Sequence, residues 1–204
     1  MKKFYLGFKR LFDILFSLFL IVLFSPLLLV LAIAVKVDSK GPVLFIQERI
    51  GKNKKVFKIL KFRTMIDKAE SVGLGIYTFE SDNRITRMGR FLRKTSLDEI
   101  PQLFNIFIGD MSFLGPRPPV TYYPYNIEDY PEDINQRFNV RPGISGYAQV
   151  NGRAELKWEQ KFVFDKYYVE HIGFVLDTKI FFKTILKVVT LSNTYRSEAK
   201  KDEK

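Results

Sequence analysis

The longest uncharged apolar run, from Ile14 to Val35, constrains this chain more than any other feature of its sequence. A helix needs roughly 20 apolar residues to cross a hydrocarbon core about 30 Å thick, and this run is long enough to do so. A cleaved signal peptide explains it less well, because the apolar region of a signal peptide spans only about 7–15 residues. The run therefore predicts a protein that resides at a membrane.

Two features argue against a straight spanning helix. Ser25 and Pro26 lie near the middle of the run, where proline removes a backbone donor and serine can donate to a carbonyl that this frees. Basic residues flank both ends, whereas a spanning helix usually carries its Lys/Arg excess on the cytoplasmic side. These flanking residues are Lys2, Lys3, Lys9, Arg10, Lys36, Lys40, Arg49, Lys52, Lys54 and Lys55. We expect a re-entrant helix over residues 1–36 that breaks at Ser25-Pro26; a straight signal anchor with a kink is the alternative.

Composition narrows the possible chemistry. The 204 residues carry a net charge of +11, no cysteine and one histidine, His171. Thiol nucleophiles, disulfides and sites with several histidines are thereby excluded. The positive charge suits an anionic membrane surface or phosphate substrates, and its spread along the chain argues against nucleic acid as a partner. Chemistry must then rest on carboxylates, Arg, Lys, Ser or Tyr.

The remaining pattern predicts an α+β, mainly helical fold with one domain over residues 37–195. Val43–Gln47 and Val56–Phe62 read as a small β-hairpin, and Arg84–Lys94 as a short basic helix. Asp177–Leu191 combines a basic row with an aromatic-rich apolar surface, which is typical of an amphipathic helix at a membrane interface; an ordinary core helix is the alternative. The charged segment 196–204 is expected to be a disordered tail.

The acidic pair Asp98-Glu99 lies within a strongly basic region and has two possible registers at a helix start. Ser96 and Glu99 match a capping box, but that register places Pro101 too far into the helix. With Asp98 as the cap, the missing N–H of Pro101 costs nothing, and the helix N-terminus would keep the carboxylate ionised. We favour the second register. Capping and catalysis both remain open as roles for the pair.

Three other segments offer groups that suit phosphate. Lys61 lies near the end of the second predicted strand and Arg63 directly after it, and Arg117 is braced by Pro116, Pro118 and Pro119, which reduce its conformational freedom. A rigid surface turn is the plainer explanation of those prolines. A glycine-bearing loop adds the polar side chains of Arg141, Gln149, Asn151 and Arg153.

Several ordered motifs together resemble one protein family. They are Phe8-Lys9-Arg10-Leu11-Phe12-Asp13, Ser25-Pro26, Lys61-Phe62-Arg63-Thr64-Met65, Ser96-Leu97-Asp98-Glu99, Gly109-Asp110-Met111-Ser112-Phe113, Gly115-Pro116-Arg117-Pro118, Arg141-Pro142-Gly143 and Gln149-Val150-Asn151-Gly152-Arg153. The chain resembles the bacterial sugar transferases, or monotopic phosphoglycosyl transferases, over roughly residues 4 to 193. No further apolar span precedes Lys9, so we expect the small catalytic form.

The resemblance implies a reaction and its site. A phosphosugar would pass from a UDP-sugar to polyprenyl (undecaprenyl) phosphate, with release of UMP, in the first membrane step of glycoconjugate assembly. The family's nucleophilic aspartate maps to Asp98 and its acidic partner to Glu99, and a covalent aspartyl-phosphosugar intermediate is implied. Mg²⁺ is expected near Asp98, and Arg93, Arg117 and Arg141 are the family-consistent phosphate ligands.

The resemblance also implies a location: the bacterial inner membrane, monotopic, with the catalytic domain facing the cytoplasm. Membrane lipids are then partners, and a homodimer is an option. The rival hypothesis from another class is a non-catalytic, basic membrane-surface scaffold in which Asp98-Glu99 only caps a helix.

Overall fold

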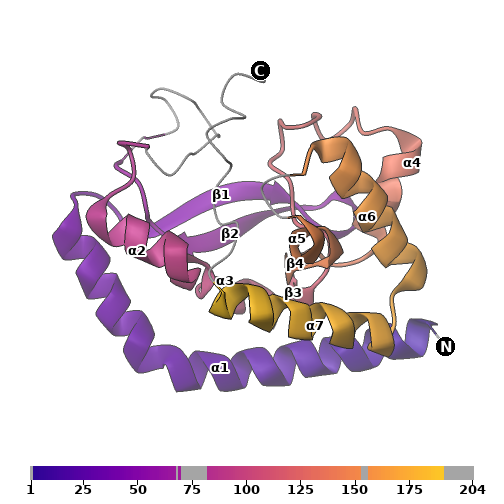
Figure 1. The fold of residues 1–204 in the computed structure, drawn as a ribbon, viewed down its shortest axis with the longest axis horizontal. Helices are drawn as coiled ribbons and strands as arrows, with labels where there is room; N and C mark the ends of the chain where they lie inside the picture. The colour runs from indigo at the N-terminus through magenta and orange to yellow at the C-terminus, as the bar shows by residue number, and fades with distance from the viewer. Residues whose placement is uncertain (1, 68, 70–81, 153–155, 191–204) are drawn as a thin grey trace.

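The structure is a computed structural model that describes residues 2–67, 69, 82–152 and 156–190 (Figure 1). Arg153 and the predicted tail 196–204 lie outside these residues, as do residues 68 and 70–81. The fold is α+β and mainly helical, as predicted, with two small sheets. Its elements are α1 (Lys2–Asp38), β1 (Leu44–Ile50), η1 (Lys52–Lys54), β2 (Val56–Phe62), α2 (Arg87–Thr95), η3 (Leu97–Glu99), α3 (Gln102–Ile108), β3 (Ser112–Leu114), α4 (Glu132–Asn135), η4 (Gln136–Asn139), β4 (Gly143–Ser145), α5 (Tyr147–Asn151), α6 (Trp158–His171) and α7 (Phe174–Val189).

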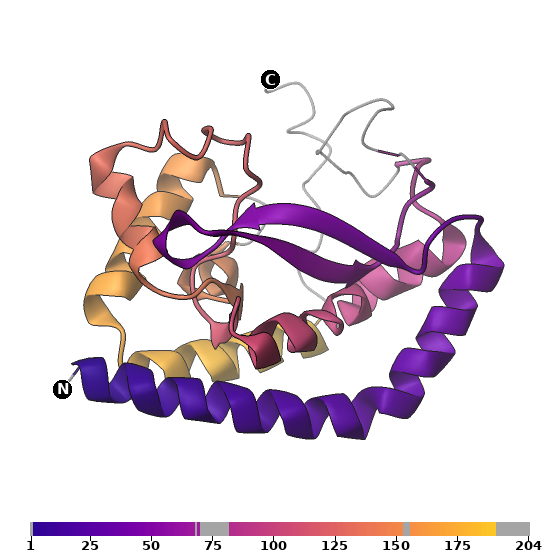
Figure 2. The ribbon, with the colours of Figure 1, turned by 180° about the vertical axis from the view of Figure 1, so that it is seen from behind.

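Helix α1 contains the whole apolar run and continues through Pro26. Figures 1 and 2 show that it bends along its length and curves around one side of the domain. Proline lacks the N–H that would bond the Val22 carbonyl, and the Ser25 hydroxyl donates to that carbonyl instead, at 2.8 Å. The predicted break therefore takes the form of a bend in a continuous helix, and the predicted role of Ser25 is confirmed.

The two ends of α1 are both attached to the folded domain. Near its start, Lys9 forms an ion pair of 2.7 Å with Asp177 of α7. At its end, the Arg63 guanidinium donates to the carbonyls of Val35 and Ser39, at 3.3 and 2.6 Å. One folded domain therefore holds both ends of α1.

One face of α1 packs on the domain while the other is apolar and exposed. Leu31 and Val35 are buried, and Asp13 is buried where it accepts hydrogen bonds from Ser112 Oγ and the Phe113 N–H, at 3.1 and 3.2 Å. The outward face carries large apolar side chains that are half or more exposed in the described part of the chain. They include Phe4, Phe8, Leu11, Phe12, Leu15, Phe19, Val22, Leu23, Leu29, Val30 and Ile33. Apolar surface of this extent on a monomer marks an interaction site.

The predicted hairpin is confirmed and is longer than predicted at its first strand. Strands β1 and β2 pair antiparallel from Leu44 opposite Phe62 to Ile50 opposite Val56. Phe57 and Ile59 of β2 are buried on one face and Phe62 on the other, because successive strand residues point to opposite faces. Lys61 follows Phe57 and Ile59 on the same face of the strand.

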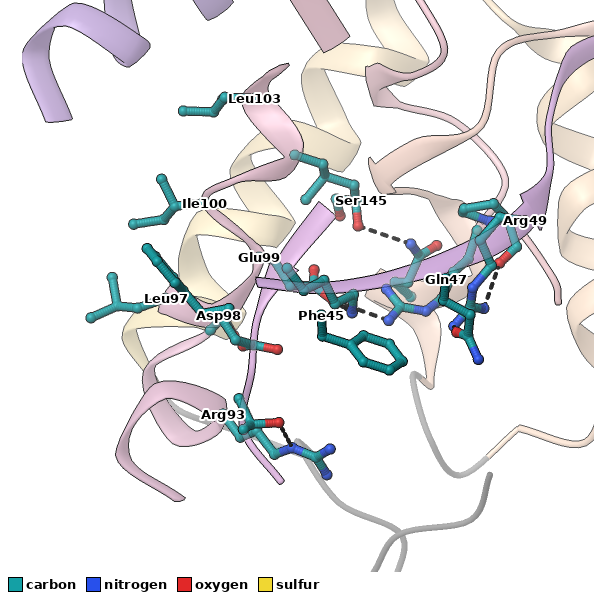
Figure 3. Close-up of a pocket in the computed structure, with 18 of the residues that line it drawn as sticks. Phe45, Gln47, Arg49, Arg93, Leu97, Asp98, Glu99, Ile100, Leu103 and Ser145 are labelled. Carbon is teal, nitrogen blue, oxygen red and sulfur yellow. Dashed lines mark hydrogen bonds and ion pairs between the residues drawn. The ribbon is translucent and has the colours of Figure 1, made fainter. Parts of the chain in front are cut away.

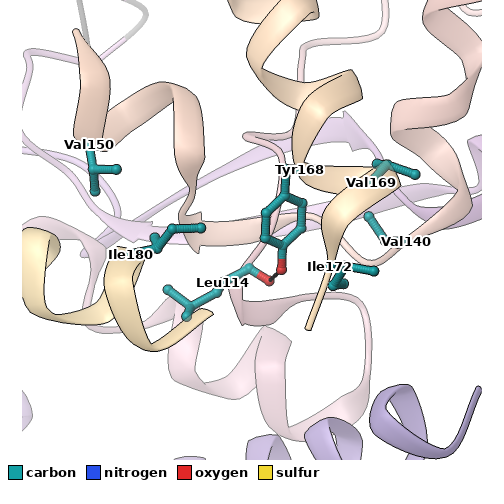
Figure 4. Close-up of a cluster of buried hydrophobic side chains, with 7 residues drawn as sticks. All are labelled: Leu114, Val140, Val150, Tyr168, Val169, Ile172 and Ile180. Carbon is teal, nitrogen blue, oxygen red and sulfur yellow. Dashed lines mark hydrogen bonds between the residues drawn. The ribbon is translucent and has the colours of Figure 1, made fainter. Parts of the chain in front are cut away.

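A second, parallel pairing was not predicted. It joins β3 to β4, two segments that the sequence presents as loops. The backbones meet so closely that a Cβ on Gly143 would lie 2.1 Å from the Gly115 nitrogen. Glycine is therefore required there for packing. Leu114 of β3 belongs to a buried hydrophobic cluster with Val140, Tyr168 and Ile180, among others (Figure 4).

Two predicted helices are present with shifted ends. Helix α2 starts at Arg87 and not at Arg84, because the Thr86 side chain caps it by accepting from the Gly89 N–H at 3.0 Å. Arg84 lies before the helix and pairs with Asp82 at 2.7 Å. Helix α7 runs from Phe174 to Val189 and buries Asp177 and Ile180.

Helix α7 also carries exposed apolar side chains, namely Phe174, Val175, Phe181, Phe182, Ile185, Leu186, Val188 and Val189. It lies beside the N-terminal half of α1 in both views (Figures 1 and 2), and Asp177 also accepts from Tyr5 and Tyr168, at 2.6 and 2.9 Å. The two helices thus present apolar side chains to the surroundings from neighbouring positions, as an interfacial helix pair would.

Candidate active site

Asp98 lies in a single 3₁₀ turn between two short helices. Helix α2 ends when Ser96 adopts a left-handed conformation, φ 59°, and its N–H bonds the Arg93 carbonyl at 3.3 Å. The turn Leu97–Glu99 follows directly. In Figure 3, Leu97 and Ile100 point to one side of this segment and the Asp98 carboxylate points to the other. Leu97 and Ile100 pack into two apolar clusters beneath α1. The apolar neighbours therefore fix the direction of the carboxylate.

Both predicted cap registers are wrong. Helix α3 begins at Gln102, immediately after Pro101, and neither Ser96 nor Asp98 makes a side-chain cap. The residues before Pro101 form a separate turn, in which the N–H groups of Glu99 and Ile100 bond the carbonyls of Ser96 and Leu97, each at 3.3 Å. Asp98 is thus released from a capping role and does not sit at the N-terminus of α3.

Glu99 is held by two cations. Its Oε1 atom lies 2.6 Å from Lys61 Nζ and 3.0 Å from an Arg117 guanidinium nitrogen. The side chains of Lys61 and Glu99 are only 14% and 19% exposed, whereas that of Arg117 is 46% exposed. The ion pair between Lys61 and Glu99 is therefore shielded from solvent, and Arg117 reaches it from the cavity side.

Asp98 differs from its neighbour. It makes no hydrogen bond or ion pair with any residue in the described part of the chain. Burial and the nearby Glu99 charge raise the pKa of Asp98 to about 6, against the opposing effects of Lys61, Arg93 and Arg117. For Glu99, burial would raise the pKa, but Lys61 and Arg117 outweigh it and hold the pKa well below its ordinary value. This corrects the expectation that a helix terminus keeps Asp98 ionised.

The two carboxyl groups are therefore separated in function by their surroundings. Glu99 stays ionised as the counter-ion of Lys61 and Arg117, and Asp98 is an uncommitted carboxyl whose pKa is raised to about 6. Pairs of titratable groups whose environments push their pKa values apart are typical of acid–base and nucleophilic sites.

A large cavity opens in front of Asp98. Its volume is about 1370 Å³, and its wall includes Lys61, Arg93, Asp98, Glu99 and Arg117. Arg93 is oriented by its hydrogen bond to Thr64 Oγ1, at 2.8 Å. Towards α1 and α7 the wall becomes apolar, with Leu20, Phe24, Ile185 and Val188. The cavity thus joins a cationic region to the apolar side of the molecule.

The structure brings most of the predicted site residues together and leaves some apart. Lys61, Arg63, Arg93, Arg117 and Gln149 line the cavity with Asp98 and Glu99. Arg63 lines the cavity, but its guanidinium is engaged by the backbone at the end of α1. Asn151 and Arg141 are not part of the wall: Asn151 Nδ2 donates to the Tyr147 carbonyl at 2.8 Å, and Arg141 Nε to the Gly109 carbonyl at 2.8 Å. Arg153 lies outside the described residues.

Sequence reasoning missed several residues of the wall, among them Gln47, Arg49, Thr64, Arg137, Trp158, Lys161 and Asp165. Thr64 lies within a motif that was recognised, so its hydroxyl could have been considered. Arg49 was counted only as a flanking charge. Arg137 and Asp165 are 28 positions apart and meet only in the fold, at 2.8 Å.

The donor set limits how a metal ion could bind here. No group of three or more Asp, Glu or His side chains that could hold a metal comes together in residues 2–67, 69, 82–152 and 156–190. Asp98 offers one free carboxylate, and Glu99 is already engaged. Mg²⁺ commonly binds through one or two carboxylates together with substrate phosphates. The residues therefore fit a Mg²⁺ ion that arrives with a diphosphate, not one held by protein alone.

Fold and site together define a membrane-associated protein whose cavity places an uncommitted carboxylate among cations, a set suited to phosphate chemistry. Comparison with known proteins agrees. The sequence profile described as bacterial sugar transferase matches residues 4–191. The chain belongs to this family.

Three relatives illustrate the match. A UDP-glucose:undecaprenyl-phosphate glucose-1-phosphate transferase from Klebsiella pneumoniae is 43% identical over 185 residues, covering 88% of this chain and 40% of the relative. A sugar transferase from Bacillus subtilis is 41% identical over 181 residues, covering 89% and 87%. A UDP-N-acetylgalactosamine-undecaprenyl-phosphate N-acetylgalactosaminephosphotransferase from Aeromonas hydrophila is 41% identical, covering 89% and 44%. The chain thus spans less than half of two of these relatives and most of the third.

Proposed function

We propose that this protein transfers a phosphosugar from a UDP-sugar to a polyprenyl phosphate, releasing UMP, at a membrane surface. The single observation that carries the proposal is the contrast between the two neighbouring carboxyl groups. Glu99 is locked by Lys61 and Arg117, and Asp98 faces the cavity without a partner among the described residues. The names of the relatives, which pair UDP-sugars with undecaprenyl phosphate, support the choice of substrates.

In the first step, an Asp98 carboxylate oxygen attacks the sugar-bearing phosphorus of the donor. A new oxygen–phosphorus bond forms, and the bond from that phosphorus to the bridging oxygen breaks, so that UMP leaves with the bonding electrons. The product is an aspartyl-phosphosugar. In the second step, an oxygen of the lipid phosphate attacks the same phosphorus and returns Asp98 as a carboxylate. Covalent catalysis thus divides one transfer between two bulky anions into two steps.

The cations of the wall have separate roles in this proposal. Arg93 and Arg117 bind the diphosphate, since a guanidinium fork suits phosphate oxygens. Lys61 keeps Glu99 ionised and adds positive charge beside Asp98. A Mg²⁺ ion bound by Asp98 and the diphosphate would neutralise charge on the departing UMP.

The lipid substrate explains why the cavity extends towards α1 and α7. A polyprenyl phosphate has a charged head and an apolar tail, and the cavity wall changes from cationic to apolar in that direction. Attachment of both ends of α1 to one domain supports a re-entrant helix that leaves the membrane by the face it entered. The catalytic domain would lie on the cytoplasmic face of the bacterial inner membrane, where nucleotide sugars are available.

The test is UMP release by purified protein in detergent, with Mg²⁺ and undecaprenyl phosphate. UDP-glucose, UDP-galactose and UDP-N-acetylgalactosamine form a first donor panel. We expect release with at least one donor, and loss of about 10³-fold or more in Asp98→Asn, because the amide is not a nucleophile. Equal release by both proteins would remove Asp98 from its role. No release with any donor would favour a membrane-surface scaffold.

A further inference from the structure

The segment that carries Arg117 is held in an unusual way. Pro116, Pro118 and Pro119 have no N–H, so the backbone from 116 to 119 can be fixed chiefly through its carbonyl groups. All four carbonyls are engaged. The Pro116 carbonyl accepts from the Gly143 N–H and the Pro119 carbonyl from the Ile50 N–H, each at 3.0 Å. The two central carbonyls accept from arginine side chains.

One of these arginines is Arg137, which is 4% exposed. Its Nη2 atom donates to the Arg117 carbonyl at 2.8 Å. The other is Arg49, whose Nη1 atom donates to the Pro118 carbonyl at 3.0 Å. The backbone that carries Arg117 is thus fixed on both sides of its Cα atom, by Gly143 before it and by Arg137 after it.

Arg137 is itself oriented from α6. Asp165 Oδ2 accepts from Arg137 Nε at 3.1 Å and lies 2.8 Å from Nη2. Both side chains are almost fully buried, at 3% and 2% exposure. The guanidinium carbon also lies 5.3 to 5.7 Å from the ring centroids of Phe138, Trp158 and Phe162. A buried arginine with a carboxylate partner and aromatic neighbours has little freedom to move.

We infer that Arg137, oriented by Asp165, is a positioning residue that sets the location of the Arg117 guanidinium against Glu99 and the substrate. The inference rests on the proposed function and goes beyond it, because it assigns a role to residues that do not themselves touch the reacting atoms. Asp165 of α6 is thereby connected to the site through Arg137 and the Arg117 carbonyl.

The test is a double-mutant cycle with UMP release as the readout. Arg137→Lys keeps the charge but cannot bond both Asp165 and the Arg117 carbonyl through one planar fork. We expect it to lower kcat about tenfold with a smaller change in the KM of the donor. Arg117→Ala should lower kcat further, and adding Arg137→Lys to Arg117→Ala should change kcat by less than twofold, since the group being positioned is gone.

Two additional variants separate positioning from loss of folding. Asp165→Asn should act in the same direction as Arg137→Lys but more weakly, because its amide oxygen can still accept from Arg137. Arg10→Lys is the matched control: Arg10 also donates to backbone carbonyls, those of Ile106 and Phe107 at 2.7 and 2.9 Å, but does not line the cavity. It should leave kcat within about twofold.

The outcomes are distinguishable. If the kcat losses of Arg137→Lys and Arg117→Ala multiply in the double mutant, the inference on Arg137 fails but the proposed function stands. The same holds if Arg10→Lys loses as much kcat as Arg137→Lys. Absence of UMP release by the wild-type protein would overturn the proposed function and the inference with it.

Discussion

Lys61 and Glu99 act on the pKa of Asp98 in opposite directions, so removing either charge should shift that pKa. Asp98 must be ionised to attack phosphorus, and its pKa is raised to about 6, chiefly by burial. The rate of the first step should therefore rise with pH and level off above the pKa. With a pKa of about 6, roughly nine-tenths of Asp98 is ionised at pH 7 and roughly one-tenth at pH 5, so the rate should fall about tenfold between them.

Two substitutions should move the acidic limb of the pH–rate profile, the pH range over which the rate rises, in opposite directions. Lys61 is the strongest of the charges that lower the Asp98 pKa, and Glu99 is the charge that raises it. Lys61→Met should therefore move the limb to higher pH, and Glu99→Gln to lower pH. A charge in close proximity typically shifts a carboxyl pKa by about one unit or more. The midpoint of the limb is informative even where either substitution also weakens donor binding.

The assay should isolate the first step. Single-turnover UMP release without acceptor avoids the second ionisation of the lipid phosphate, which also falls near pH 6. Lys58→Met is the control, because Lys58 is exposed on the same strand and does not line the cavity; solvent and salt screen such a charge. Limbs that stay in place, or move in the same direction in both site variants, would refute the electrostatic account of Asp98.

Two further predictions concern the fold. Single cysteines at the exposed Lys3 and Lys40 should be labelled from the same membrane face in a chain that has no native cysteine; labelling from opposite faces would restore a straight span. Gly143→Ala should lower the free energy of unfolding by about 3 kcal/mol or more, because the new Cβ would lie 2.1 Å from the Gly115 nitrogen. Gly7→Ala, which meets no atom within 4 Å, should leave thermal unfolding in detergent unchanged; equal midpoints for both variants would contradict the packing described here.

Local patterns in the sequence were enough to predict the elements whose stability is local. The apolar run, the hairpin and α7 follow from periodicity and turn residues, and Ser25 beside Pro26 follows from the chemistry of one missing N–H. The shifted start of α2 reflects the capping side chain of Thr86. Contacts within one element, or between two strands joined by a short turn, decide these features.

The remaining features depend on contacts between distant segments. No local pattern around Ser112 predicts its parallel pairing with Gly143. The glycines of both loops have a packing role that their spacing in the sequence does not predict. The ion pair of Arg137 with Asp165 could not be predicted either, because the two residues are far apart in the sequence and meet only in the fold.

The sequence predicted most residues of the site but not the pKa values of its carboxyl groups. The motifs identified Asp98, Glu99 and Arg117, yet the expected helix terminus at Asp98 proved wrong because Pro101 starts the helix later. The pKa of a carboxyl depends on burial and on neighbours from β2, α2 and the proline-rich segment. These are properties of the assembled cavity.

The most direct test of the central claim is to locate the phosphosugar on the protein. The protein is incubated with Mg²⁺ and a UDP-sugar labelled with ³²P on the sugar-bearing phosphate, without polyprenyl phosphate, then denatured and digested for mass spectrometry. We predict one equivalent of UMP at most, label on the peptide that contains Asp98, and loss of that label on addition of undecaprenyl phosphate. UMP release that strictly requires the acceptor, or label on another residue, would contradict the proposed role of Asp98.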